Sequence, residues 1–162
     1  MIYLALPSKT DEHRRDLIWL EAKLRSRGLE YVSTRDLAST VSASDPDREW
    51  KLFKVNIEAL VRSDLLLFDN DTDDPHVIWA AGVFYGVNIG LETRLHKSLQ
   101  VPMVSFTRAP RLVVQSDRIV HLHLYNARSL LRFLDEAARL REGDFIPWMK
   151  VIENCSSMDM EQ

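Results

Sequence analysis

The sequence predicts a single α/β domain in which a doubly wound parallel sheet of five strands lies between two layers of helices. Two observations predict it. Short apolar runs bounded by turn residues alternate with longer segments whose apolar residues recur at helical spacing. The length of 162 residues, with 46% hydrophobic and 28% charged residues, suits one globular domain. Strands that alternate with helices imply parallel pairing through right-handed crossovers.

The N-terminal quarter predicts a strand, a helix and a second strand. Residues 2–6 form a continuous apolar run, as expected for a buried strand. Residues 11–27 carry acidic residues first and basic residues last, a charge order that suits the helix dipole. Gly28 then suits the helix C-cap, and residues 29–33 predict the second strand.

The next segment predicts a loop and an amphipathic helix. Residues 34–46 are rich in Ser, Thr, Ala and Asp, and we expect a surface loop. Residues 47–61 predict a helix, with Asp45 as the N-cap and Pro46 at the first helical position. Its apolar residues fall on one face: Trp50, Phe53, Ile57, Leu60 and Val61.

The centre of the chain predicts the third strand and a long helix. Residues 64–68 are almost continuously apolar, and an acidic loop follows them. Asp74 and Pro75 suit the N-cap and first position of a helix that runs to about residue 97. Glycines at 82, 86 and 90 weaken this helix by up to about 1 kcal/mol each, and they either permit close packing or mark a break.

The C-terminal third predicts two more strands, at residues 101–106 and 119–124, and a helix at residues 129–140. We expect one domain over residues 1–154 and a loose polar tail over residues 155–162. The whole pattern is that of a flavodoxin/Rossmann-like three-layer fold. Ligands bind such sheets beyond the carboxyl ends of the strands, which selects the loops that follow Leu6, Phe68 and Phe106.

Composition excludes several classes of protein. A formal net charge of -3 argues against a general nucleic-acid binder. Cys155, the single cysteine, cannot form an internal disulfide, and neither a signal-peptide pattern nor an apolar run of membrane-spanning length is present, so we expect a cytoplasmic protein. The acidic loop at 69–74 and the pair His121 and His123 are weak metal motifs, and we expect no metal and no cofactor.

Three segments, taken in order, resemble the nucleoside 2-deoxyribosyltransferase family. The first is IYLALPS at residues 2–8. The second joins DREW at 47–50 to NIEAL at 56–60 and to a Ser-Asp pair before the third strand. The third is DPHVIWAAG at 74–82. The resemblance covers roughly residues 1–106, with an apparent insertion around 87–98.

The resemblance implies nucleophilic chemistry at an N-glycosidic bond. In the family a glutamate attacks C1′ of a 2-deoxynucleoside, the base leaves, and a second base or water resolves the glycosyl ester. Tyr3 matches the tyrosine that orients the glutamate, and Asp74 matches the acid that contacts the base. Asn56 stands where aspartate is usual, and Ala80 stands at the position of the nucleophile.

A methyl group cannot attack C1′, so we expect the chain to bind without turnover. Glu58 should face solvent, and Glu92 lies about 18 Å further along a continuous helix, so neither replaces the nucleophile. Three explanations of Ala80 stay open: natural loss, a deliberate Glu→Ala substitution, or a shifted alignment. Two other functions also stay open, a 2′-deoxynucleoside 5′-phosphate N-hydrolase and a non-catalytic nucleotide-binding or sensing domain.

The remaining candidate ligand contacts are Pro7, Ser8, Asp69, His76 and Trp79. Each candidate also has a purely structural interpretation: Tyr3 as a core residue, Asn56 at the boundary of an apolar face, Asp74 as an N-cap, and Trp79, like Trp50, as core. We expect a small-molecule nucleoside or nucleotide as the ligand. Because family members complete each site from a neighbouring subunit, we also expect a homo-oligomer.

Overall fold

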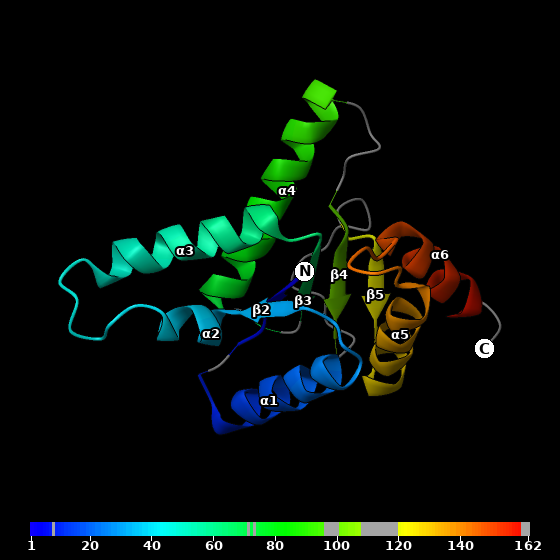
Figure 1. Cartoon of the computed structure of the whole chain (residues 1–162), viewed down its shortest axis with the longest axis horizontal. Coiled ribbons are helices and arrows are strands. Elements are labelled where there is room, and N and C mark those ends of the chain that lie inside the picture. The colour runs from blue at the N-terminus through cyan, green and yellow to red at the C-terminus, as the bar shows by residue number, and fades with distance from the viewer. Residues whose placement is uncertain (8, 71, 73, 96–100, 108–119, 160–162) are drawn as a thin grey trace.

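A computed structural model describes residues 1–7, 9–70, 72, 74–95, 101–107 and 120–159 (Figure 1). Its centre is one five-stranded sheet in the order β2-β1-β3-β4-β5, with every neighbouring pair parallel. The strands are β1 Ile2–Ala5, β2 Tyr31–Ser33, β3 Leu65–Asp69, β4 Met103–Phe106 and β5 Leu122–Leu124. The predicted doubly wound sheet is confirmed, and its strand order reverses between β1 and β3.

The helices form a layer on each face of this sheet. One layer contains α1 (Asp11–Ser26), α5 (Ala127–Leu140) and α6 (Trp148–Asp159), and the other contains α3 (Arg48–Arg62) and α4 (Pro75–Leu95). A short helix, α2 (Thr34–Ser39), follows β2. The two layers enclose separate apolar cores, one on each side of the strands.

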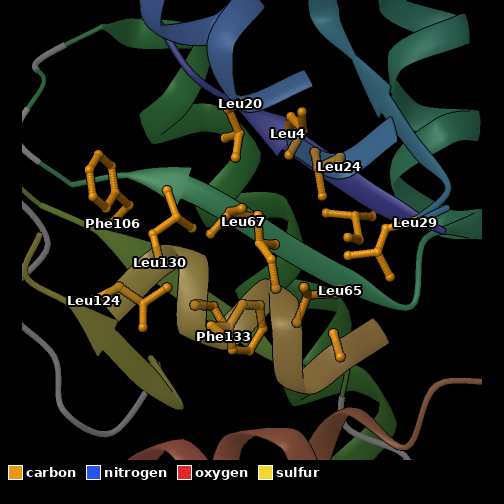
Figure 2. Packing of buried hydrophobic residues seen from close by; sticks show 14 of the residues in the cluster. Leu4, Leu20, Leu24, Leu29, Leu65, Leu67, Phe106, Leu124, Leu130 and Phe133 are labelled. Carbon is orange, nitrogen blue, oxygen red and sulfur yellow. The ribbon is translucent and has the colours of Figure 1, made fainter. Parts of the chain in front are cut away.

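Alternation along the strands divides their side chains between these cores. Leu65 and Leu67 of β3 face α1 and α5, whereas Leu66 and Phe68 face α3 and α4. Both faces are therefore buried, which explains why the strands are continuous apolar runs rather than alternating ones. Figure 2 shows Leu65 and Leu67 packed between α1 and α5, with Phe133 of α5 beside them.

The helix α1 begins at Asp11, as predicted, but it ends at Ser26, and its C-cap is Arg27 rather than Gly28. Thr10 is the N-cap, and its hydroxyl oxygen accepts a hydrogen bond from the His13 backbone N–H at 3.1 Å. Gly28 has φ +64°, a left-handed conformation that favours glycine just after a helix. This end is also tied to α5, because the Arg27 guanidinium pairs with the Asp135 carboxylate at 2.7 Å.

The expected surface loop at residues 34–46 is wrong for its first half, which is α2. Ser33 and Asp36 form a capping box that starts the helix: the Ser33 hydroxyl accepts from the Asp36 N–H, and the Asp36 carboxylate accepts from the Ser33 N–H. Arg35 then reaches the fully buried carboxylate of Glu21 on α1, at 2.9 Å. The capping box and this ion pair together stabilise a helix in a segment whose composition is typical of a loop.

The start and the apolar face of α3 also differ from expectation. The N-cap is Asp47 rather than Asp45. The Asp45 carboxylate instead accepts a hydrogen bond from the Asp47 N–H at 2.9 Å and pairs with the Lys51 ammonium group at 2.5 Å. The apolar residues keep their helical spacing, but Trp50 and Val61 are 58% and 66% exposed. The face was expected to be buried, yet the N-terminal part of α3, which carries Trp50, extends beyond the sheet that would cover it (Figure 1).

The expected loose tail from Cys155 is wrong through residue 159. These residues continue α6, and the Cys155 side chain is buried in the core beside Val151 and Ile152. Composition alone suggested a tail because the polar residues Ser156, Ser157 and Asp159 follow the cysteine. The helix is stabilised by packing on α5, not by its own propensity.

Candidate functional site

A chain of polar contacts joins β1, α3 and the N-terminus of α4. The Tyr3 hydroxyl donates a hydrogen bond to Oδ1 of Asn56 at 2.7 Å. The same hydroxyl oxygen lies 3.5 Å from Nε2 of His76. Three of the candidate residues, far apart in the sequence, therefore meet at one place on the α3/α4 face of the sheet.

The surrounding structure fixes Tyr3 and Asn56. Tyr3 is fully buried in the α3/α4 core, and this burial raises the pKa of its hydroxyl far above the ordinary value of 10.0. The hydroxyl is therefore protonated at neutral pH and acts as a donor. The Asn56 side chain is held from the other end, because its Nδ2 donates to the Leu52 carbonyl at 2.7 Å.

Asp74 is the N-cap of α4, as predicted. Its Oδ1 accepts from the His76 backbone N–H at 2.9 Å, which satisfies one of the free donors of the first turn. Its Oδ2 lies 3.2 Å from Nζ of Lys9, a side chain that is largely exposed. Because the cap fixes the carboxylate, Asp74 stays next to His76 with its charge balanced by Lys9.

An aromatic row leads from solvent into this polar cluster. The ring of Trp50 stacks on Phe53 with centroids 5.5 Å apart, Phe53 lies 5.9 Å from Trp79, and Trp79 lies 5.6 Å from the His76 imidazole. Burial lowers the pKa of His76 below its ordinary value, and the Asp74 charge opposes this only in part. His76 is therefore a neutral imidazole at pH 7, flanked on one side by an indole.

Ala80 lies one helical turn after His76 on the same face of α4. It is fully buried in the core cluster that also contains Tyr3. Its methyl group contributes packing and no polar atom. The position that the sequence resemblance aligns with a nucleophile is thus an apolar part of the core that also holds Tyr3.

The other candidate residues lie outside this cluster. Pro7 is buried just after β1, and Ser8 falls outside the described residues. Asp69 ends β3 three positions beyond the residue that pairs with Tyr3, about 10 Å along the sheet. Strand alternation also turns Asp69 toward the α1 face, away from Tyr3.

The metal motifs weighed in the sequence form no site in the described part of the chain. No group of three or more His, Cys, Asp or Glu residues there could hold a metal ion. His121 accepts from the Met103 N–H at 3.1 Å, and His123 lies 2.5 Å from the Ser105 hydroxyl. Asp71 and Asp73 of the acidic loop fall outside the described residues.

Two contributors to the site were missed in the sequence. Lys9 balances Asp74, and its position directly after the first strand, at the carboxyl edge of the sheet, was the available signal. Phe53 links Trp50 to Trp79, but its helical spacing indicated only a core residue. Glu58 is exposed on α3, as predicted.

Comparison of the whole structure with solved structures identifies the fold. A 2-deoxyribosyltransferase from the psychrotolerant bacterium Bacillus psychrosaccharolyticus superposes with a TM-score of 0.64 at 19% identity, over 80% of this chain and 89% of that one. The chain has the fold of a 2-deoxyribosyltransferase. A conserved protein from Enterococcus faecalis V583 superposes with a TM-score of 0.54 at 17% identity, over 97% of both chains.

Sequence comparison adds no family, since no family model and no curated protein matches the chain. The likeness to a 2-deoxyribosyltransferase therefore rests on the fold, and the roles of individual residues rest on the geometry described above. Within the described residues, no helix combines the length and the apolar character needed to cross a membrane.

Proposed function

We propose that this chain binds nucleosides or nucleotides at the cluster of Tyr3, Asn56, Asp74 and His76, and that it does not cleave them as it stands. The observation that carries the proposal is the 2.7 Å hydrogen bond from Tyr3 to Asn56, with His76 and Asp74 directly beside it. The fold of a 2-deoxyribosyltransferase supports the ligand class. The separate motifs of the sequence resemblance meet in this one cluster.

The residues divide the binding between them. Asp74 offers carboxylate oxygens to donors of a base, and Trp79 supplies an aromatic wall beside it. Tyr3 and Asn56 form the polar floor beneath the sugar. Because Ala80 offers only a methyl group there, no glycosyl ester can form at this position.

A phosphorylated ligand is the second candidate, and Lys9 favours it. Its exposed ammonium group lies at the edge of the cluster, 3.2 Å from Asp74, where it could also pair with a 5′-phosphate. This would relate the chain to 2′-deoxynucleoside 5′-phosphate N-hydrolases. A non-catalytic nucleotide sensor would use the same contacts. It differs from a disabled enzyme because a glutamate placed at position 80 would not make it cleave its ligand.

The test is to restore the carboxylate. Calorimetric titration should detect binding of deoxynucleosides, or of their 5′-monophosphates, to the chain with Ala80, and chromatography should detect no release of base. Ala80→Glu should then release base from the bound ligand, and transfer to an added acceptor base separates a transferase from a hydrolase. Since position 80 is fully buried, we expect overpacking to cost about 1–3 kcal/mol of stability.

Ala80→Gln is the matched control, because it adds the same bulk without a nucleophilic oxygen. It should fold as well as Ala80→Glu and release no base. If the glutamate variant folds, binds nucleosides and still cleaves nothing, the chain is a binding domain rather than a disabled enzyme. If neither nucleosides nor nucleotides bind the natural chain, the proposed site is wrong.

The outer faces of α3 and α4 support a homo-oligomer. Trp50, Phe53 and Val61 on α3 are exposed, as are Ile78 and Tyr85 on α4. Residues 75–91 of α4 contain no Asp, Glu, Lys or Arg. The two helices contact each other through the rings of Phe53 and Trp79, and we propose that a second copy of the chain covers these exposed side chains beside the site. A strictly monomeric mass at micromolar concentration in solution scattering would contradict this.

The proposed compartment is the cytoplasm. Cys155 is the one cysteine of the chain, so it cannot form an internal disulfide, and its side chain is buried in α6, which suits a reducing compartment. Fractionation of the native host cell tests this, because recovery outside the cytoplasm would contradict it.

A further inference from the structure

The hydrogen bonds of the cluster give His76 a role that rests on the proposed function and extends it. We infer that His76 is held as the Nε2–H tautomer and presents Nδ1 as the acceptor for a hydroxyl or N–H group of the bound nucleoside. The inference follows from the partners of three side chains, taken in order from α3 to α4.

The two partners of the Asn56 side chain determine which way its amide group is oriented. One end of the amide faces the Leu52 carbonyl at 2.7 Å and the other faces the Tyr3 hydroxyl, also at 2.7 Å. A carbonyl oxygen accepts only, so the NH2 group must face Leu52. The Asn56 oxygen therefore faces Tyr3 and needs a donor from it.

The single hydroxyl proton of Tyr3 is used in the hydrogen bond to Asn56. Its hydroxyl has one hydrogen, and the short contact with Asn56 takes it. The Tyr3 oxygen then has only lone pairs left for His76, whose Nε2 lies 3.5 Å away. Nε2 must carry a proton to interact favourably there. The distance is long for a hydrogen bond, as is common where a site tightens around its ligand.

The remaining group is Nδ1, the opposite nitrogen of the His76 ring. A neutral imidazole carries one proton, so protonated Nε2 leaves Nδ1 as an acceptor. None of the described residues forms a hydrogen bond with Nδ1 of His76. This nitrogen is also not fully buried. It is therefore open to solvent, beside the Trp79 ring and next to the Asp74 cap.

The neighbours of His76 keep it neutral in the working range. From β1 it faces Tyr3, which stays protonated, and from its own helix it faces Asp74, whose charge is balanced by Lys9. The α3 residue of the cluster is the uncharged Asn56, which reaches the Tyr3 hydroxyl, and on α4 the uncharged Trp79 ring lies beside the imidazole. Burial outweighs Asp74 and lowers the pKa of His76, so Nδ1 is lost as an acceptor only below the usual titration range near pH 6.5.

Two measurements test the inference. Nitrogen NMR of the uniformly labelled chain at pH 7.5 should find the proton of His76 on Nε2. Calorimetric titration with a deoxynucleoside from pH 5 to 8 should give constant affinity above about pH 6.5 and falling affinity below it. His76→Phe should bind about 3- to 10-fold more weakly at pH 7.5, the loss expected for one hydrogen bond, with no fall attributable to this site at acid pH.

Matched variants distinguish the effect of the hydrogen-bond acceptor on His76 from the effect of the size of its side chain. His76→Asn keeps an oxygen near the position of Nδ1 and should retain most of the affinity without the acid fall. His13→Asn, on α1 across the sheet, should reproduce the pH profile of the natural chain. A His76 proton on Nδ1, or His76→Phe binding with unchanged affinity and pH profile, overturns the inference and leaves the proposed function standing. If no nucleoside binds at any pH, both fall together.

Discussion

The two faces of the sheet are built from similar elements but differ in how far they are closed. On the α1/α5/α6 face, three helices bury a continuous apolar core that includes Phe133 (Figure 2). The Phe133 ring stacks on Trp148 of α6 with centroids 6.0 Å apart. On the α3/α4 face the core is closed only at the sheet, and both helices extend beyond it (Figure 1). Large apolar side chains are exposed on both helices, among them Trp50 and Phe53 on α3 and Ile78 and Tyr85 on α4.

This difference separates stability from function. The closed face holds the larger of the two apolar cores, and its helices bury few polar groups apart from the Glu21 carboxylate. The open face places a tyrosine, an amide, an imidazole and a carboxylate within an otherwise apolar layer. Polar groups buried in an apolar core lower its stability, so a hydrogen-bonded cluster of them indicates a ligand-binding site rather than a device for packing.

The largest effect that this comparison predicts is on the closed face. Phe133→Ala removes a ring that is fully buried between α5 and the sheet, and it should lower the free energy of unfolding by about 3–5 kcal/mol. Urea denaturation followed by circular dichroism measures this. A loss below 1 kcal/mol would show that the α1/α5/α6 face is not the stabilising one.

A smaller effect concerns the tie between α5 and α6. Arg139 donates to the Glu136 carboxylate at 2.7 Å and Asn154 of α6 donates to it at 2.6 Å, and these bonds lower the pKa of Glu136 from 4.5 to about 2. Because the pKa is lowered on folding, the stabilisation is complete above pH 4.5 and is lost as the pH falls from there to 2. Arg139 is well exposed, so screening reduces the contribution to about 1 kcal/mol.

Glu136→Gln should therefore lower stability by about 1 kcal/mol at pH 7 and leave it nearly unchanged at pH 2. Denaturant unfolding at a series of pH values measures the difference. Glu153→Gln is the matched control, because this glutamate is exposed on α6. An equal loss at both pH values for Glu136→Gln would mean that packing, not charge, ties the two helices.

The sequence predicted the closed face better than the open one. Apolar runs, the dipole order of α1 and the turn at Gly28 are local signals, and they agree with the structure. The same was true of Asp74 and Pro75 at the start of α4, where residue preference and geometry coincide. The meeting of Tyr3 with Asn56 was predicted only through the family resemblance, because no local signal links residues 53 positions apart.

The failures have one physical origin, which is that burial depends on distant partners. The spacing of Trp50 and Phe53 is that of a core face, but no described element covers α3 at that distance from the sheet. The polar composition near Ser33 suggested a loop, and the partner that stabilises α2 there is Glu21, twelve residues earlier. The direction of the Tyr3 proton depends on the Leu52 carbonyl, which no residue type reveals.

The smallest effect on stability is expected where the same substitution is moved to the open face. Phe53 is 44% exposed, so Phe53→Ala should lower the free energy of unfolding by less than about 1 kcal/mol, against 3–5 kcal/mol for Phe133→Ala. Its effect should appear in association, because the substitution removes the middle ring of the row between Trp50 and Trp79. Light scattering across a concentration series should find a weaker oligomer than that of the natural chain. A large loss of stability with unchanged association would mean that the α3/α4 face works as core, and the contrast between the two faces would disappear.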